Sequence, residues 1–460
     1  MCLQTTYYLE SGLLLKLGGT YSKIHSLVLA ITFWGLIFVS FSFEAFTVSG
    51  SPQRIGSTWA KSYWPGAGAN VMSIQPTDDG GYVAVGNDIQ YRMWIFKVDS
   101  KGLVKWSSTL GQGGGGASSV TSTSDHGFVV AGTVGVMDGL RILLVKLDER
   151  GNISWEKTYG SPGSVEFASS IIQTSDGGYV VVGSRQLGPG IDVGAGAWVF
   201  KIDSSGSIVW QKAYLNGGGF YAVSESLDGN LVAVGTAPWG TLESMWVVLM
   251  DHNGNALWQN TYRTNRFYNS VAFAVSSTSD GGYIVAGPTD SATSILLLKL
   301  NANGSVSWDK TYSSAGLGNF QSVIQRHDGS IVAAGYIGDI ILVTAVDPTY
   351  GNELWHQTFR VEGGSTAYSV AETKHGGLIV GGNIWSNVYR TLTGLVLKLN
   401  SEGICCNKIM YQIPIMIQSP NVTVTESNTI SVISNATINI SNLTSNPHVE
   451  TIVTAECEVE

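Results

Sequence analysis

The chain has 460 residues, of which 44% are hydrophobic and 13% charged, and its formal net charge is −9. This acidic balance, without a basic cluster, argues against nucleic acid and anionic membrane surfaces as partners. The 57 glycines show no Gly-X-Y period, and beside 14 Trp and 19 Tyr residues they indicate many tight turns between short strands.

The first candidate element is the hydrophobic run LVLAITFWGLIFVSFSF at residues 27–43. Lys16, Lys23 and His25 precede it, an arrangement typical of a secretion signal or an N-terminal membrane anchor. The run is at the short end of the about 17–25 residues that span a bilayer. We therefore interpret residues 1–50 as a signal peptide or a membrane anchor, leave its cleavage open, and expect a secreted or cell-surface protein.

One phrase then recurs in seven copies, spaced 46 to 52 residues apart. The copies are DGGYVAVG from Asp79, DHGFVVAG from Asp125, DGGYVVVG from Asp176, DGNLVAVG from Asp228, DGGYIVAG from Asp280, DGSIVAAG from Asp328 and HGGLIVGG from His375. A second phrase, such as VFKIDSSGSIVWQKAY around Trp210, accompanies the first. Each unit thus has four short apolar segments separated by glycine turns, which predicts an all-β, seven-bladed β-propeller of four-stranded blades over residues 51–411.

One copy of the Trp phrase lies outside the seven units. Trp59 and Tyr63 have the spacing of WEKTY and WQKAY, whereas Asn407 stands where the seventh unit should carry its Trp. We predict that residues 57–64 supply the fourth strand of the last blade and close the ring, so that a sheet edge is covered. A degenerate eighth blade is the alternative.

Beyond Tyr411 the composition shifts to Ser, Thr, Asn and β-branched residues. We interpret residues 412–460 as a β-rich tail, either glycosylated or folded as a small β appendage. Cys405 or Cys406 is a possible disulfide partner of Cys457, and the pairing stays open. Candidate glycosylation sites are the Asn-X-Ser/Thr residues Asn152, Asn303, Asn421, Asn435, Asn439 and Asn442.

The combined unit TSDGGYIVAG…LLLKLNANGSVSWDKTY resembles the DGGY/Trp-repeat propellers of prokaryotic secreted or surface proteins. A more distant resemblance is to the quinoprotein (PQQ-like) propellers, whose blades carry the docking phrase Ala-x-Asp-x-x-x-Gly-x-x-x-Trp. In this chain AVDPTYGNELW matches that phrase at Ala345, Asp347, Gly351 and Trp355. In that family the phrase joins blades, so the resemblance implies a shared structure and not quinone chemistry. We expect no cofactor and no metal.

The loops that differ between units predict the binding surface, because variable loops on a rigid scaffold commonly carry function. By topology they share one face of a propeller, opposite the uniform turns. Exposed aromatic and basic residues there suit a glycan or a protein partner. The candidates are Trp239, Arg266, Phe267, Tyr268, Trp385, Tyr389 and Arg390.

The predicted function is therefore a non-catalytic binding scaffold for a glycan or a surface protein. No catalytic residue is identified by a motif. The alternatives are an enzyme with a site at the channel mouth, either polysaccharide-cleaving or quinone-dependent, and a purely structural component of a surface layer. The oligomeric state is left open, and contact with a membrane is expected only through the N-terminal segment.

Overall fold

A computed structural model describes residues 58–66, 68–186, 196–214, 218–237, 244–264, 270–289, 294–313, 316–360, 363–387, 390–405, 410–411, 415–419, 422–426, 432–433 and 452–459. All of them belong to one compact unit, Arg54–Glu460. The hydrophobic run at residues 27–43 lies outside the described residues. Within the described ranges, no helix is long and apolar enough to cross a membrane.

The described residues form strands, turns and loops, so the predicted all-β class is confirmed. Twenty-eight strands make seven antiparallel sets of four, which we number by their order along the chain. Set one is β2 (Ala69–Pro76), β3 (Tyr82–Asp88), β4 (Met93–Val98) and β5 (Val104–Leu110); set two is β6 (Gly116–Ser122), β7 (Phe128–Val136), β8 (Gly139–Leu147) and β9 (Ile153–Tyr159); set three is β10 (Val165–Gln173), β11 (Tyr179–Gln186), β12 (Gly196–Ile202) and β13 (Ile208–Tyr214). Set four is β14 (Gly219–Glu225), β15 (Leu231–Thr236), β16 (Met245–Met250) and β17 (Ala256–Thr264); set five is β18 (Ala274–Ser277), β19 (Tyr283–Pro288), β20 (Ser294–Leu300) and β21 (Val306–Ser313). Set six is β22 (Gly318–Gln325), β23 (Ile331–Ile337), β24 (Ile340–Val346) and β25 (Glu353–Phe359); set seven is β26 (Ser365–Glu372), β27 (Leu378–Ser386), β28 (Thr391–Leu399) and β1 (Thr58–Trp64).

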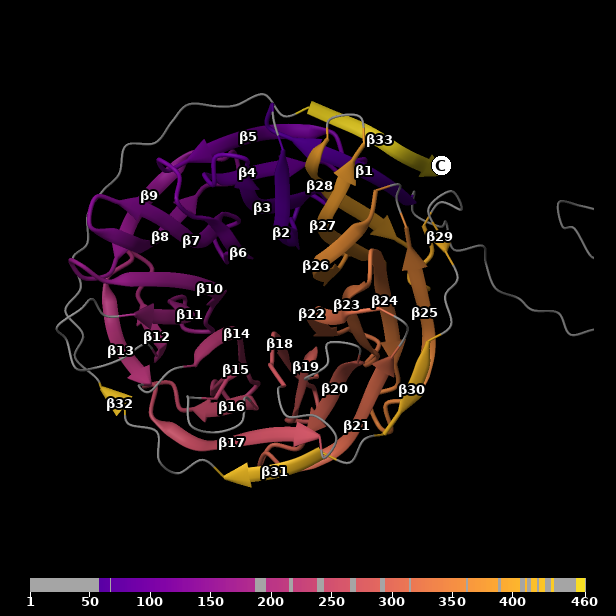
Figure 1. Ribbon diagram of the computed structural model, residues 1–460. Coiled ribbons are helices and arrows are strands. Elements are labelled where there is room, and N and C mark those ends of the chain that lie inside the picture. Colours follow the sequence, from indigo (N-terminus) through magenta and orange to yellow (C-terminus); the bar gives the residue numbers. More distant parts are fainter. Residues whose placement is uncertain are drawn as a thin grey trace, which may run out of the picture. The chain divides into compact units, whose positions relative to one another are not determined.

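The core is divided among the contacts between neighbouring sets. Figure 1 shows the sets around a common centre, with β2, β6, β10, β14, β18, β22 and β26 innermost. Each of seven hydrophobic clusters contains residues of two successive sets, and one of them joins set seven to set one. Each set therefore buries its two faces only against its two neighbours.

The N-terminal strand takes the place that the sequence predicts for residues 57–64. It pairs antiparallel with β28, and all seven of its residues are buried. The Trp59 indole N–H donates to the Ser100 carbonyl oxygen at 3.1 Å, and the Tyr63 hydroxyl donates to the Gly102 carbonyl oxygen at 2.8 Å. Trp155 and Tyr159 of set two make the same two bonds to set three, so the Trp-x-x-x-Tyr phrase fastens these outer strands to the next set.

The repeated phrase contains two kinds of glycine. Gly177, in the Asp-Gly-Gly turn, has φ +82°, a backbone conformation that other residues rarely adopt. Gly183, at the end of the phrase, has no such φ. Instead, a Cβ atom built on Gly183 would lie 1.9 Å from the carbonyl oxygen of Phe167 on the inner strand β10. The last glycine is thus required by the close approach of two strands.

Four lysines at the same position of their units pair with the aspartates of the repeated phrase. Lys97, Lys146 and Lys299 lie 2.8 to 2.9 Å from the carboxylates of Asp79, Asp125 and Asp280, and Lys201 contacts Asp176. Partial burial acts to raise the pKa of each carboxyl, but hydrogen bonds from the lysine, a threonine and a backbone N–H outweigh it. The pKa of all four carboxyls is lowered to about 2.

These carboxyls predict a loss of stability in acid. A folded-state pKa below the unfolded value contributes stability that is present above the unfolded value, near 4, and is lost as the pH falls toward 2. For Asp176→Asn we expect the slope of the unfolding free energy against pH to decrease by up to about one proton between pH 4 and 2. Urea titrations at several pH values measure this slope. Lys201→Met should reduce the slope as well, and an unchanged slope in both variants would contradict the assignment.

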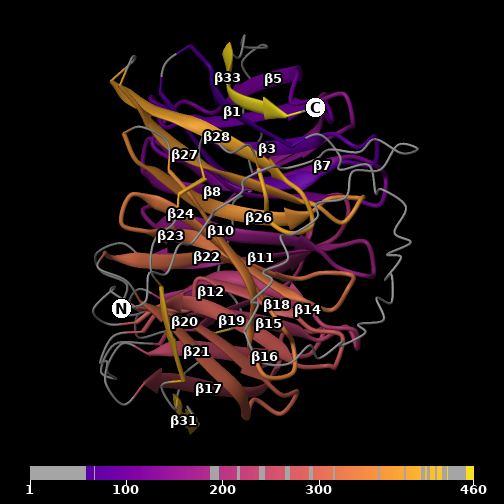
Figure 2. The ribbon, with the colours of Figure 1, turned by 90° about the vertical axis from the view of Figure 1, so that its right-hand side faces the viewer.

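The described strands from Met410 to Val459 pair with the outer edges of the sets. β29 (Met410–Tyr411) pairs with β25, β30 (Met416–Gln418) with β21, β31 (Val422–Glu426) with β17, β32 (Val432–Ile433) with β13 and β33 (Ile452–Val459) with β1. Figures 1 and 2 show β31 and β33 on opposite sides of the ring. The described part of residues 412–460 therefore extends the repeat sheets and forms no sheet of its own.

Candidate functional site

The structure describes two of the seven predicted binding residues, Trp385 and Arg390. The other five lie outside the described residues: Trp239, Arg266, Phe267, Tyr268 and Tyr389. Trp385 and Arg390 flank the connection between β27 and β28. The Trp385 side chain is 42% exposed, and its backbone N–H donates to the Gly364 carbonyl oxygen at 3.0 Å. Arg390 is exposed and has φ +51°.

Other predicted sites are only partly described. Asn152 and Asn303 are exposed, whereas Asn421, Asn435, Asn439 and Asn442 lie outside the described residues. Cys405 is buried in the cluster between sets six and seven, Cys406 is outside the described residues, and Cys457 lies on β33 opposite Ala60. The possible disulfide stays a prediction.

A network of polar side chains lies where set seven meets set one. The Asn383 amide donates to Asn70 Oδ1 at 2.9 Å and lies 3.5 Å from Tyr368 Oη, while its own oxygen accepts from the Thr366 hydroxyl. The Asn70 amide donates in turn to Asn87 Oδ1 at 3.5 Å. We call these five residues the seam cluster. They come from β27, β2, β26 and β3, so strands from the two ends of the repeat array build it together.

The seam cluster lies beside the exposed tryptophan. Side chains alternate between the two faces of a strand, so Asn383 and Trp385 share one face of β27. Leu392, which is 38% exposed, lies on β28 directly opposite Trp385 of β27. Trp385 thus adds an accessible apolar surface next to a row of amide groups.

Backbone bulges deliver further residues to the inner strands. Six inner strands have one extra residue at the same position, which the sequence analysis did not identify. The sequence pattern that marks this bulge is a variable residue followed by Ser or Ala and then by Val or Ile. The bulged residues are Met72, Ser118, Ser169, Tyr221, Gln321 and Tyr368.

Two of the bulged residues contact aromatic neighbours. The Tyr221 ring, 37% exposed, lies with its centroid 4.8 Å from that of Phe273. In set six, Gln321 hydrogen-bonds Tyr336, whose pKa is raised by burial and further by the nearby Tyr368. The inner strands of sets four to seven thus present half-buried phenol, phenyl and amide groups in place of the short side chains of sets two and three.

The strongest charge cluster of sets two and three is enclosed. Glu166 is fully buried, with Arg141 and Arg185 at 3.6 and 3.3 Å. Burial raises the pKa of the Glu166 carboxyl, and the hydroxyl of Ser164 and the two guanidinium groups act against this rise. The cluster flanks the one residue pair, Val165 and Leu140, that joins β10 to β8. It stabilises the junction of two sets and is not an accessible site.

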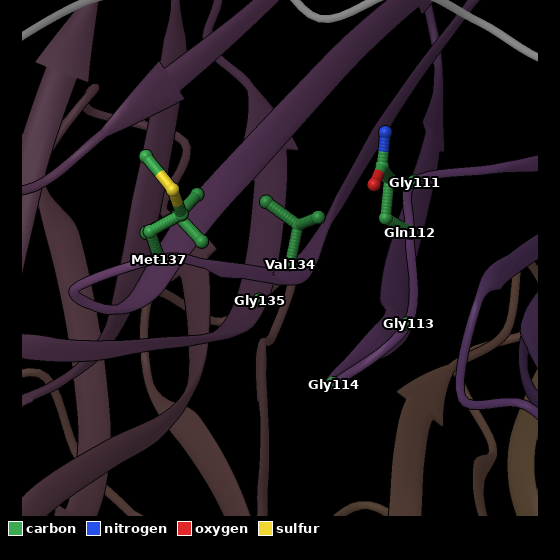
Figure 3. A pocket seen from close by; sticks show the side chains of 8 residues that line it. Gly111, Gln112, Gly113, Gly114, Val134, Gly135 and Met137 are labelled. Atoms are coloured by element: carbon green, nitrogen blue, oxygen red, sulfur yellow. The ribbon is translucent and has the colours of Figure 1, made fainter.

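A shallow pocket of about 600 Å³ lies between sets one and two. Figure 3 shows its lining, with Gln112, Val134 and Met137 as the side chains around a wall of glycines. The Gly135 N–H donates to the Gly113 carbonyl oxygen at 2.9 Å. This bond joins the Gly-rich stretch 111–117 to β7. The pocket offers few side-chain polar groups for specific recognition. Within the described ranges, no group of three or more His, Cys, Asp or Glu side chains is placed to hold a metal ion.

No protein-family model and no curated protein matches the chain. Among solved structures it is similar to Sqt1 from Chaetomium thermophilum bound to the N-terminus of the ribosomal protein L10, at 15% identity and TM-score 0.42 over 74% of this chain and 98% of that one. It is also similar to the Dos1 propeller, at 10% identity and TM-score 0.43 over 76% and 98%, and to the polysaccharide lyase Uly1, at 9% identity and TM-score 0.41 over 72% and 90%. These structural neighbours are propeller-like, and such distant likenesses carry no argument about the ligand of this chain.

Proposed function

We propose that the chain is an exported seven-bladed β-propeller, closed by β1, whose blades are the seven strand sets. Residues 51–411 form the propeller, residues 412–460 form its tail, and residues 1–50 are a signal peptide or membrane anchor. Asn152 and Asn303 are exposed, as glycosylation of either would require. The resemblance to the DGGY/Trp-repeat propellers of prokaryotic surface proteins supports this reading, as does the shared burial between set seven and set one.

We infer that the protein binds a neutral glycan at the seam cluster and Trp385. The observation that carries this proposal is the row of amide and hydroxyl groups beside an exposed indole. Amide and hydroxyl side chains donate and accept hydrogen bonds, which matches the hydroxyls of a sugar. The indole supplies an apolar face on which a sugar ring stacks. The seam cluster has no carboxylate, whereas glycoside cleavage usually requires two, so binding without catalysis is favoured over an enzyme.

A glycan-array screen followed by titration calorimetry tests the proposal. We expect Trp385→Ala to weaken binding of the best glycan by about tenfold, or about 1.4 kcal/mol. Tyr350→Ala is the matched control, because Tyr350 is 69% exposed and lies in the uniform turn between β24 and β25. Equal affinity in wild type and Trp385→Ala would exclude this site. If no glycan binds, the second candidate is a protein partner that binds to the same face.

A further inference from the structure

We propose that set seven binds the carboxylate of an acidic peptide at Thr373, Gly377 and Lys398. The repeated phrase contains an aspartate in the other six sets, whereas His375 stands at that position in set seven. The residues at the three surrounding positions are still the threonine, glycine and lysine that occur beside the aspartate in other sets. A carboxylate from another molecule therefore meets donors that bind an aspartate elsewhere in the ring.

Set five shows how these donors hold a carboxylate. Asp280 Oδ1 accepts from the Thr278 hydroxyl at 2.5 Å and from the Gly282 N–H at 3.0 Å. Lys299 Nζ donates to the same oxygen at 3.0 Å. Sets one, two and three have the same three donors around their aspartates. The aspartate side chains of these four sets are 58 to 63% exposed, so the corresponding place is open to a ligand from solvent.

Set seven keeps the backbone of this arrangement. Gly376 has φ +77°, and its N–H donates to the Thr373 carbonyl oxygen at 2.9 Å, the same distance as in set five. The Thr373 N–H donates to the Gly377 carbonyl oxygen at 2.8 Å. Lys398 lies on β28 opposite Ile379, which is the register of the lysine in set five. The backbone therefore holds all three donors at the positions that they have around an aspartate.

The donors of set seven are not satisfied by a carboxylate. Lys398 Nζ turns to the Ser100 carbonyl oxygen, at 3.1 Å. Burial lowers the pKa of the Lys398 ammonium group. Within the part of the chain that the structure describes, neither the Thr373 hydroxyl nor the Gly377 N–H donates a hydrogen bond. A half-buried cation without a counter-charge is costly, so this site favours an anion.

Two other sets that depart from the pattern compensate within themselves. Set four has leucine in place of the lysine, and the Asn230 amide donates to Asp228 Oδ2 at 2.7 Å. Set six has alanine in that place, and Arg326 Nη1 lies 3.0 Å from Asp328 Oδ2. In set seven, the described residues supply no such replacement for the aspartate. The anion that balances Lys398 therefore comes from another molecule.

A further donor at the same turn favours a peptide over a free carboxylate ion. The Gln325 amide oxygen of set six accepts from the Ser279 N–H of set five at 2.6 Å. In set seven Lys374 has the place of Ser279, and in set one Pro76 has the place of Gln325. Proline has no polar side-chain atom, so the backbone N–H of Lys374, an exposed residue, is left to bind a ligand. A peptide presents a backbone carbonyl oxygen beside its aspartate carboxylate, which matches this donor.

NMR titration of the full chain, labelled with [ε-13C]lysine, tests the proposal. The probe is acetyl-Gly-Asp-Gly-amide, and the peptide with Asn in place of Asp is the neutral control. We expect the Lys398 signal, assigned through Lys398→Arg, to shift in a saturable way with the Asp peptide and to stay in place with the Asn peptide. Lys299 is the internal control, and its signal should not respond because Asp280 already binds it.

His375→Asp is the matched variant, because it supplies the aspartate that the other six sets have. An aspartate within the turn competes at high effective concentration, so the affinity of Lys398 for the Asp peptide should fall by at least about tenfold. His375→Ala should keep the response, since the imidazole is not among the donors.

Four results would overturn the proposal. Equal shifts of Lys398 and Lys299 would show only general screening of charge. An unchanged response in His375→Asp would place the peptide elsewhere. The third is no shift of Lys398 up to about 50 mM peptide, well above the millimolar affinity expected of a few charge-assisted bonds. The fourth is a stronger response to digalacturonate than to the Asp peptide, because the ligand would then be an acidic sugar.

Discussion

Gly183→Ala is expected to destabilise the protein by about 3 kcal/mol or more, at the upper end of the cost of overpacking. The added methyl group would lie 1.9 Å from the Phe167 carbonyl oxygen. That oxygen is a backbone atom of β10, which is paired with β11, so it cannot move aside as a side-chain atom could. Relief therefore requires separation of β10 from β11 at the bulge. Urea unfolding monitored by tryptophan fluorescence gives the free energy of unfolding of the variant.

Gly177→Ala is the matched control, because Gly177 lies six positions before Gly183 in the same repeated phrase and is constrained in the opposite way. A Cβ atom on Gly177 would meet nothing within 4 Å, but its φ of +82° is unfavourable for alanine. The left-handed conformation costs about 1–2 kcal/mol. If Gly183→Ala proves no more harmful than Gly177→Ala, strand approach is not the reason for the last glycine.

Removal of β1 is expected to abolish cooperative folding. A chain that begins at Gly66 lacks the seven buried residues of β1, among them Trp59, Tyr63 and Trp64. Burial of each large apolar side chain contributes about 1.5–3 kcal/mol, and a typical domain is stable by only about 5–15 kcal/mol. Set seven would also lose the partner of β28, and β33 would lose the strand with which it pairs.

Thermal unfolding by circular dichroism tests this expectation against a chain that begins at Arg54 and keeps β1. The truncated chain should show a broad transition or none, and a synthetic peptide of residues 58–66 should restore a sharp one. A transition at the same temperature in both chains would show that set seven does not need its fourth strand.

The strand sets were predictable because their turns impose strict demands on the sequence. The position of Gly177 has a positive φ in all seven units, and it is glycine in six of them and His126 in the other; the Trp59–Tyr63 phrase revealed the displaced strand. The tail pairings were not predictable, since pairing through the main chain leaves little trace in side-chain identity. The seam cluster was missed for a related reason. It depends on which strands meet when β2 and β26 become neighbours, and Asn70 and Asn383 are 313 positions apart.

The pairing of β33 with β1 has a mechanical consequence. The two strands are antiparallel, and Thr58 lies opposite Val459, so the chain enters and leaves this pair at the same end. A force that pulls these two residues apart acts on one backbone hydrogen bond at a time, like the opening of a zipper. A force applied along β1 against β28 loads their bonds together instead. Tension between the two ends would therefore release β33 first, and β1 would stay seated on β28.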